Sequence, residues 1–143
     1  MSYYTWITED VAIGELNASY DAFDTIVNIA YINPTVNGIE HGTMVTSYRD
    51  GKIIYKIGVY DTDADKDLFI DLLDRTVPLI DGDNILFHCQ AGKSRSVCVA
   101  MAFICRKTGM SVEECLDLIK RKRVVADPRP AFVEKVKVWL GQQ

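Results

Sequence analysis

A short apolar run, a loop of small and polar residues and a longer apolar run follow one another in the middle of the chain. The first run is Ile85–His88, the loop is the stretch CQAGKS, and the second run covers residues 97–106. A short run of three apolar residues and a histidine after a turn signal predicts a buried strand, and the nearly continuous apolar run of ten residues predicts a helix buried on most sides. This strand–loop–helix unit needs a sheet and further helices around it, so it constrains the fold more than any other feature.

Apolar patterns elsewhere in the chain predict the elements that surround this unit. Strands are expected at Val11–Gly14, at residues 25–30 and at residues 52–60, and helices at residues 68–76, from the capping box of Ser111 and Glu114 onward, and at residues 132–140. Residues 17–23 are predicted as a polar helix-like segment, and residues 31–51 as a long loop or a loose hairpin around residues 44–48. This order of elements predicts an α/β domain with a central mixed, mostly parallel sheet flanked by helices.

Length and composition fit one folded domain over residues 1–143. A chain of 143 residues can bury a core without staples, and 48% hydrophobic with 25% charged residues is ordinary for a globular protein. The formal net charge of −4 disfavours general binding to nucleic acids. No apolar run approaches the roughly 20 residues that cross a bilayer, and the first residues lack a secretory signal pattern. We therefore expect no transmembrane segment and a cytoplasmic or nuclear protein.

The cysteines favour a reducing compartment. Cys98, Cys105 and Cys115 fall in apolar helical patterns, no pair of cysteines forms a CxxC motif, and no second His/Cys pair stands at metal-ligand spacing. We expect core packing for these three residues and no bound metal. A disulfide between Cys98 and an oxidised Cys89 stays open as a lesser alternative.

The loop between the predicted strand and helix has the composition of an anion site. Its backbone N–H groups and the helix N-terminus bind a tetrahedral anion, Gly92 gives the backbone freedom, and the guanidinium of Arg95 can hold two oxygens. The same groups favour a thiolate at Cys89 over a thiol. We infer a nucleophile that attacks a phosphate monoester and forms a phosphocysteine, which water then hydrolyses. The predicted substrate-binding residues are Gln90, Ala91, Gly92, Lys93, Ser94 and Arg95.

A general acid and a partner for the thiolate complete this chemistry. The leaving oxygen needs a proton, and Asp61, Asp63, Asp65 and Asp67 are the candidates on a neighbouring segment. Asp61 is favoured because it directly follows the predicted strand 52–60, whereas the other three aspartates suit a helix N-terminus. Ser96 can donate a hydrogen bond to the sulfur as it leaves, and His88 can help to orient the loop backbone.

The sequence His88-Cys89, five residues and then Arg95-Ser96 resembles the HCxxxxxR signature of the protein tyrosine phosphatases. The longer stretch HCQAGKSRS is similar to the dual-specificity branch, notably the MAP-kinase phosphatases, and the likeness covers residues 13 to 139. The resemblance implies the protein tyrosine phosphatase fold, Cys89 as nucleophile, Arg95 as phosphate clamp, Asp61 as general acid, Ser96 as thiolate partner, and no metal or cofactor. Residues 123–132 resemble the late segment of that family, which begins with an arginine and ends in Pro-Asn-x-x-Phe.

Two departures keep the substrate open. Arg129 stands where the family commonly has Asn, and Lys93 fills a loop position that lipid-directed members of the superfamily make basic. The leading hypothesis is a phosphatase of phosphotyrosine and phosphoserine/phosphothreonine in proteins, with phosphoinositides or other anionic lipids as the rival substrates. A phosphate-binding pseudophosphatase is disfavoured because the Cys and Arg are both present, and the acidic balance disfavours an RNA 5′-triphosphatase. AGKS is not a Walker loop, because Phe87 stands where that loop needs Gly.

Two further features have two interpretations each. The basic run at residues 120–123 either docks an acidic partner or lipid headgroups, or is a solvated helix end favoured by the helix dipole. Tyr3, Tyr4 and Trp6 either line a substrate groove or pin the N-terminal segment to the core. Trp139 is expected in the core. The sequence does not indicate an oligomeric state.

Overall fold

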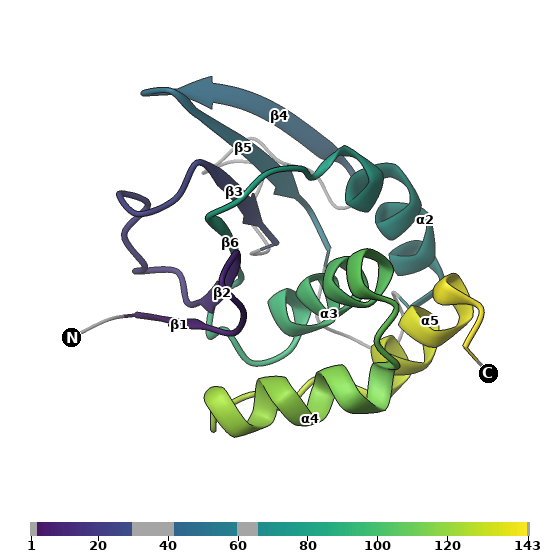
Figure 1. Cartoon of the computed structure of the whole chain (residues 1–143). Helices are drawn as coiled ribbons and strands as arrows, with labels where there is room; N and C mark the ends of the chain where they lie inside the picture. Colours follow the sequence, from purple (N-terminus) through teal and green to yellow (C-terminus); the bar gives the residue numbers. More distant parts are fainter. Residues whose placement is uncertain (1–2, 30–41, 60–65, 143) are drawn as a thin grey trace.

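The structure, a computed structural model, describes residues 3–29, 42–59 and 66–142. These residues form a sheet with helices packed against it (Figure 1). The strands are β1 (Tyr4–Trp6), β2 (Val11–Gly14), β3 (Thr25–Asn28), β4 (Met44–Arg49), β5 (Lys52–Ile57) and β6 (Ile85–His88). The helices are α2 (Lys66–Thr76), the 3-10 turn η2 (Val77–Leu79), α3 (Arg95–Thr108), α4 (Val112–Lys122) and α5 (Pro130–Leu140).

The sheet is mixed and mostly parallel, as predicted. Its strand order is β1-β2-β6-β3-β5-β4; the four inner strands are parallel, and the two edge strands β1 and β4 pair antiparallel with their neighbours. Strand β6 lies between β2 and β3, and its last residue, His88, pairs with Gly14 and with Asn28. The carboxyl ends of three strands therefore meet at one point of the sheet edge, where the CQAGKS loop begins.

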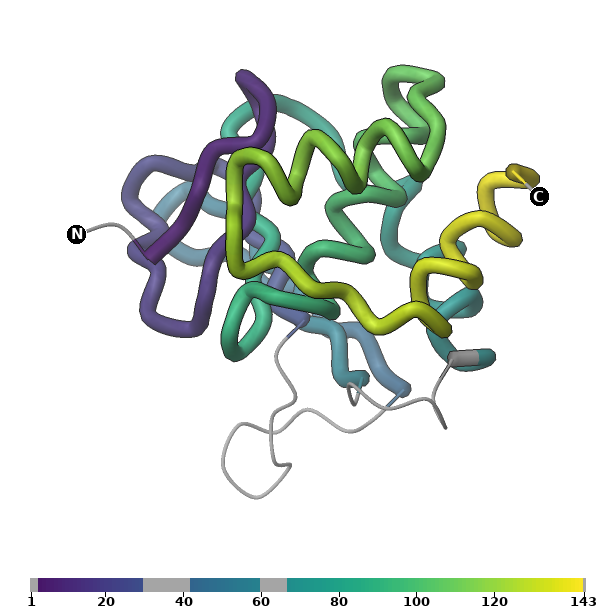
Figure 2. The backbone as a smooth tube through the Cα atoms, turned by 90° about the horizontal axis from the view of Figure 1, so that it is seen from below, coloured from purple at the N-terminus to yellow at the C-terminus, as the bar shows by residue number. Residues whose placement is uncertain are grey.

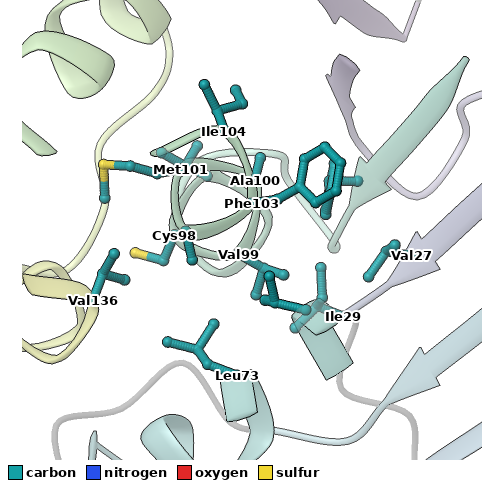
Figure 3. Packing of buried hydrophobic residues seen from close by; sticks show 14 of the residues in the cluster. Val27, Ile29, Leu73, Cys98, Val99, Ala100, Met101, Phe103, Ile104 and Val136 are labelled. Atoms are coloured by element: carbon teal, nitrogen blue, oxygen red, sulfur yellow. The ribbon is translucent and has the colours of Figure 1, made fainter. Parts of the chain in front are cut away.

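Helix α3 occupies the centre of the larger core. Every residue from 95 to 105 is buried, and Figure 3 shows Val27 and Ile29 of the sheet side, Leu73 of α2 and Val136 of α5 arranged around the helix. A helix surrounded on all sides must be apolar all round, which is why its sequence lacks an amphipathic pattern. The three cysteines expected in the core, Cys98, Cys105 and Cys115, are each at most 2% exposed.

The opposite face of the sheet is covered by residues 15–24, where the predicted helix-like segment is wrong. These residues form turns, in which Ala18 N–H donates to Glu15 O at 3.0 Å and Phe23 N–H donates to Tyr20 O at 3.0 Å. Short polar residues compete with helix hydrogen bonds, as Ser19 Oγ does by accepting from Asp21 N–H at 3.3 Å. The turns bury Ala18 and Phe23 against the sheet.

The N-terminal aromatic residues pin strand β1 to this smaller core. The Phe23 ring centroid lies 5.0 Å from that of Tyr4 and 5.1 Å from that of Trp6. For Tyr4 and Trp6, packing is the interpretation that the structure supports, whereas Tyr3 is 43% exposed. Trp139, which was expected in the core, is only partly buried: its indole N–H donates to Asp74 at 3.4 Å, and Arg106 lies 5.3 Å from its ring centroid.

The hairpin interpretation of residues 44–48 is confirmed, because β4 and β5 pair across the turn at Asp50-Gly51. Both turn residues have positive φ, 54° and 77°, which matches the handedness of a two-residue hairpin turn. Within the described residues, no helix has the length and apolar character needed to cross a bilayer.

Candidate active site

The phosphate-binding loop predicted from the sequence joins the carboxyl end of β6 to the amino end of α3. Cys89 is the first residue after β6 and is 2% exposed. Its Sγ lies 3.1 Å from Oγ of Ser96, which is itself fully buried in the first turn of α3. A strand end and a helix start, both locked in the core, therefore hold this thiol and hydroxyl together.

The carbonyl groups of the loop all bond outward, to the protein around it. Leu16 N–H donates to Gln90 O at 3.0 Å, Arg123 Nη2 to Ala91 O at 3.4 Å, Arg123 Nε to Gly92 O at 2.8 Å and Asp127 N–H to Lys93 O at 2.8 Å. In a trans peptide, the N–H group of the next residue points opposite to the carbonyl. The N–H groups of residues 91–94 therefore face the other side, the interior of the loop, where an anion can accept from them.

Gly92 allows this loop to pass close to β2. Its φ is +67°, and a Cβ at this position would lie 2.7 Å from the carbonyl oxygen of Gly14. Only glycine fits both the left-handed backbone and the close approach.

Arg95 lies in the first turn of α3 and is buried, at 7% exposure of the residue. Its Nη1 donates to Val59 O at 3.0 Å, whereas its buried Nε has no hydrogen-bond partner within the part of the chain that the structure describes. A buried donor without a partner is costly, and an oxyanion in the loop would satisfy it. The bond to Val59 also ties the site to the segment that carries the predicted acid.

The predicted general acid lies outside the described residues. Asp61, Asp63 and Asp65 follow Val59 in residues 60–65, and the structure describes none of them. Asp67 stands in the first turn of α2, 83% exposed, with its carboxylate 2.9 Å from Nζ of Lys135. This placement supports the interpretation of Asp67 as a helix charge, and Asp61 stays a prediction.

Arg123 differs from its prediction. It was predicted as part of an exposed basic helix end, but it is 8% exposed and donates to Ala91 O, Gly92 O and, at 3.0 Å, Thr5 Oγ1. Burial lowers the pKa of its guanidinium, and the charges of Glu15 and Cys89 act in the opposite direction.

His88 supports the loop from the strand side. Its Nδ1 lies 3.4 Å from the carbonyl oxygen of Cys89, which only accepts, and its Nε2 lies 2.6 Å from the Tyr20 hydroxyl. We therefore assign the ring proton to Nδ1, and the Tyr20 hydroxyl donates to Nε2. Burial lowers the pKa of His88 from 6.5 to about 4, against the weaker effect of the Cys89 hydrogen bond, so the ring is neutral at physiological pH.

The low pKa of His88 predicts that the domain loses stability on mild acidification. The unfolded chain binds this proton from about pH 6.5, whereas the folded chain binds it only near pH 4. The neutral His88 ring therefore contributes to the free energy of unfolding in full above pH 6.5, and this contribution is lost as the pH falls toward 4. The free energy of unfolding should fall by about 2 kcal/mol between about pH 7 and about pH 5. Urea unfolding at both pH values measures it. His88→Gln should abolish this part of the pH dependence, and His41→Gln, at the only other histidine, should keep it; equal slopes in the two variants would contradict the assignment.

Among the described residues, no group of three or more His, Cys, Asp or Glu side chains is placed to hold a metal ion. All four cysteines are free thiols.

Comparison with known proteins connects this site to a family. The family model "Dual specificity phosphatase, catalytic domain" matches residues 13–141. The chain is 40% identical over 66 residues to dual specificity protein phosphatase 15 of Rattus norvegicus, which is 45% of this chain and 28% of that protein. It is 27% identical over 131 residues to the putative tyrosine phosphatase 123R of Invertebrate iridescent virus 6, which is 81% of this chain and 92% of that one. The chain thus spans about a quarter of the rat relative and most of the viral one.

Solved structures show the same fold. The human tyrosine phosphatase-like serine/threonine/tyrosine-interacting protein superposes with a TM-score of 0.69 at 16% identity, over 96% of this chain and 95% of the human one. Similarity at this identity shows the fold alone, and that fold is the one expected from the sequence.

Proposed function

The chain belongs to the dual specificity phosphatase family, and on this premise we propose that it is a cysteine-dependent phosphatase acting on phosphotyrosine and phosphoserine/phosphothreonine in proteins. The observation that carries the proposal is the loop whose carbonyls of residues 90–93 bond outward, with the buried Cys89 Sγ at its start, 3.1 Å from Ser96 Oγ. A phosphate monoester is a tetrahedral oxyanion, and it matches the loop N–H groups and the Nε of Arg95, which has no hydrogen-bond partner among the described residues.

The proposed reaction proceeds in two steps. The Cys89 thiolate attacks phosphorus and forms an S–P bond as the P–O bond to the substrate breaks, and Asp61 gives a proton to the leaving oxygen. A water then attacks the phosphocysteine and gives its proton to the Asp61 carboxylate, and the S–P bond breaks. Ser96 donates a hydrogen bond to the sulfur as the thiolate leaves, while the loop and Arg95 hold the phosphoryl oxygens through both steps. Inorganic phosphate and the free enzyme remain.

Trapping the covalent intermediate tests this proposal. The protein would be mixed with a phosphotyrosine peptide in the presence of a metal chelator, quenched within one turnover and digested for mass spectrometry. We expect a phosphoryl group on the peptide that contains Cys89, inhibition of turnover by vanadate and no effect of the chelator. Turnover without phosphorylated Cys89 would refute the mechanism, and the absence of any turnover would favour a phosphate-binding module.

Asp61→Asn is expected to lower kcat for a phosphotyrosine peptide by about 10²- to 10³-fold, because the leaving oxygen then departs without a proton. The loss should be smaller on an aryl phosphate whose leaving group is weakly basic, and larger on an alkyl phosphate. Asp63→Asn is the matched control and should keep kcat. The reverse pattern, with the loss in Asp63→Asn, would move the acid to that residue.

Anionic lipids are the second candidate substrates, because the side chain of Lys93 is exposed at the phosphate-binding loop. Arg129, the second residue that departs from the family pattern, donates its backbone N–H to Ser94 Oγ at 3.0 Å, so the segment around it also supports the loop. The comparison of kcat/KM on phosphopeptides with that on phosphoinositide vesicles decides between the two classes. We place the protein in a reducing compartment, the cytoplasm or the nucleus, on the basis of its free cysteines.

A further inference from the structure

A group of exposed apolar and basic side chains stands beside the phosphate-binding loop, and we call it the rim patch. It consists of Leu16, Lys120, Lys122, Val124 and Val125. The exposed fractions are 52% for Leu16, 87% for Val124 and 50% for Val125. A cluster of this kind on a folded domain marks an interaction surface more often than an isolated exposed apolar residue does.

Hydrogen bonds place the rim patch around the loop. Leu16 N–H donates to Gln90 O at 3.0 Å on one side. On the other side, Nε of Arg123, the residue before the two valines, donates to Gly92 O at 2.8 Å. The backbone N–H of Asp127, two residues after Val125, donates to Lys93 O at 2.8 Å. Figure 2 shows this connection between α4 and α5 passing beside the loop that precedes α3. Leu16, Val124 and Val125 therefore flank the phosphate-binding loop, and Lys120 and Lys122 precede the two valines in the last turn of α4.

The helix dipole explains only part of this surface. Cations in the last turn of α4 are stabilised by the helix C-terminus, and Arg121 also has a carboxylate oxygen of Asp117 at 3.5 Å. The dipole gives no reason for the next residues, where a charged side chain, Arg123, is buried while Val124 and Val125 point into solvent. The chain here turns its polar group inward and its apolar groups outward, the opposite of the usual preference.

An anionic bilayer is the partner that fits these groups. Val124, at 87% exposure, projects from the surface, so it does not form the wall of a groove such as a peptide ligand needs. Projecting apolar side chains with basic neighbours instead enter the headgroup region of anionic membranes. Lys120 and Lys122 have no ion pair within the described residues. The exposed Lys93 adds a third positive charge, and the exposed Asp127 adds one negative charge.

The charge of the rest of the molecule favours an orientation with the rim patch toward an anionic surface. The chain has a formal net charge of −4, so an anionic surface repels most of it and attracts the locally basic rim. We propose that the rim patch docks the entrance of the active site on anionic lipid surfaces, where it meets phosphate esters presented at the membrane. This goes beyond the proposed phosphatase function, and binding is measured without turnover, so either one can fail while the other stands.

Vesicle flotation with the full chain tests the docking surface. We expect binding to phosphatidylcholine vesicles that contain about 30% phosphatidylserine, little binding to pure phosphatidylcholine, and a loss of binding as salt shortens the screening length. Lys120→Glu with Lys122→Glu should reduce the partition coefficient by at least about 25-fold, since each basic residue near an anionic surface contributes about fivefold. Val124→Ser with Val125→Ser should reduce it as well.

Matched controls lie at the opposite end of the sheet. Arg49, at the end of β4, and Leu79 in η2 are exposed, and Arg49→Glu with Leu79→Ser makes one charge reversal and one apolar-to-polar change away from the loop. The control variant should bind vesicles like the wild type, and every variant should keep kcat/KM on a soluble phosphopeptide. Three outcomes overturn the proposal: no anion-dependent binding by the wild type, equal loss in the control variant, or a loss of soluble-peptide activity in the rim variants, which would assign the patch to peptide recognition.

Discussion

Cys89→Ser is expected to lower kcat for phosphopeptide hydrolysis by at least about 10⁴-fold, because a serine hydroxyl in this loop stays protonated and is a poor nucleophile. The substitution exchanges one atom at a residue that is 2% exposed, next to a hydroxyl partner that Ser can also use. The free energy of unfolding should therefore change by no more than about 1 kcal/mol. Single-turnover kinetics and urea unfolding measure the two quantities. The variant should still bind phosphopeptide, since the loop N–H groups and Arg95 are unchanged.

Cys98→Ser is the matched control for this prediction. Cys98 lies in the next turn of α3 from Arg95 and is fully buried in the core (Figure 3), so a hydroxyl there should cost about 1 to 3 kcal/mol of stability and leave kcat intact. The two variants should show opposite patterns of activity and stability. Retention of more than about 1% of kcat in Cys89→Ser would show that another residue is the nucleophile.

The strand–loop–helix unit was predictable because the apolar pattern that identifies it is local in sequence. Ile85–His88 is a strand in the structure as in the prediction, and α3 contains the predicted residues 97–106. Both elements are buried, so an uninterrupted apolar run identifies them without knowledge of what packs on them. The loop between them was predictable for the same reason: its cysteine, glycine and arginine fall within seven residues.

The missed features depend on residues that are distant in sequence. Arg123 belongs to a run of four basic residues, and it differs from the other three only because the carbonyls of Ala91 and Gly92 and the hydroxyl of Thr5 reach it. The turns over residues 15–24 form because Ala18 and Phe23 find the sheet beneath them. The hydrophobic periodicity within either segment gives no information on these distant contacts. Both errors lie where backbone polar groups near the site are satisfied by distant residues.

The outward-bonded carbonyls also predict that Gly92 tolerates no side chain. In Gly92→Ala, the added methyl group would lie 2.7 Å from the Gly14 carbonyl oxygen and 2.9 Å from its carbonyl carbon. These atoms belong to a strand that is paired on both sides, between β1 and β6, so the loop must move instead. A shift would weaken the bonds from Arg123 and turn the loop N–H groups away from the phosphate. We expect kcat to fall by about 10²-fold or more and the free energy of unfolding to fall by about 2 to 4 kcal/mol.

Gly51→Ala separates the backbone cost from the steric cost. Gly51 has a φ of +77°, close to that of Gly92, but no atom lies within 4 Å of a Cβ built there. Its substitution should cost about 1 kcal/mol and leave kcat unchanged, because only the left-handed backbone is strained. Steady-state kinetics and urea unfolding of both variants give the comparison. If Gly92→Ala behaved like Gly51→Ala, the loop would not depend on its close approach to Gly14, and the N–H groups would be oriented by the bonds from Arg123, Leu16 and Asp127 alone.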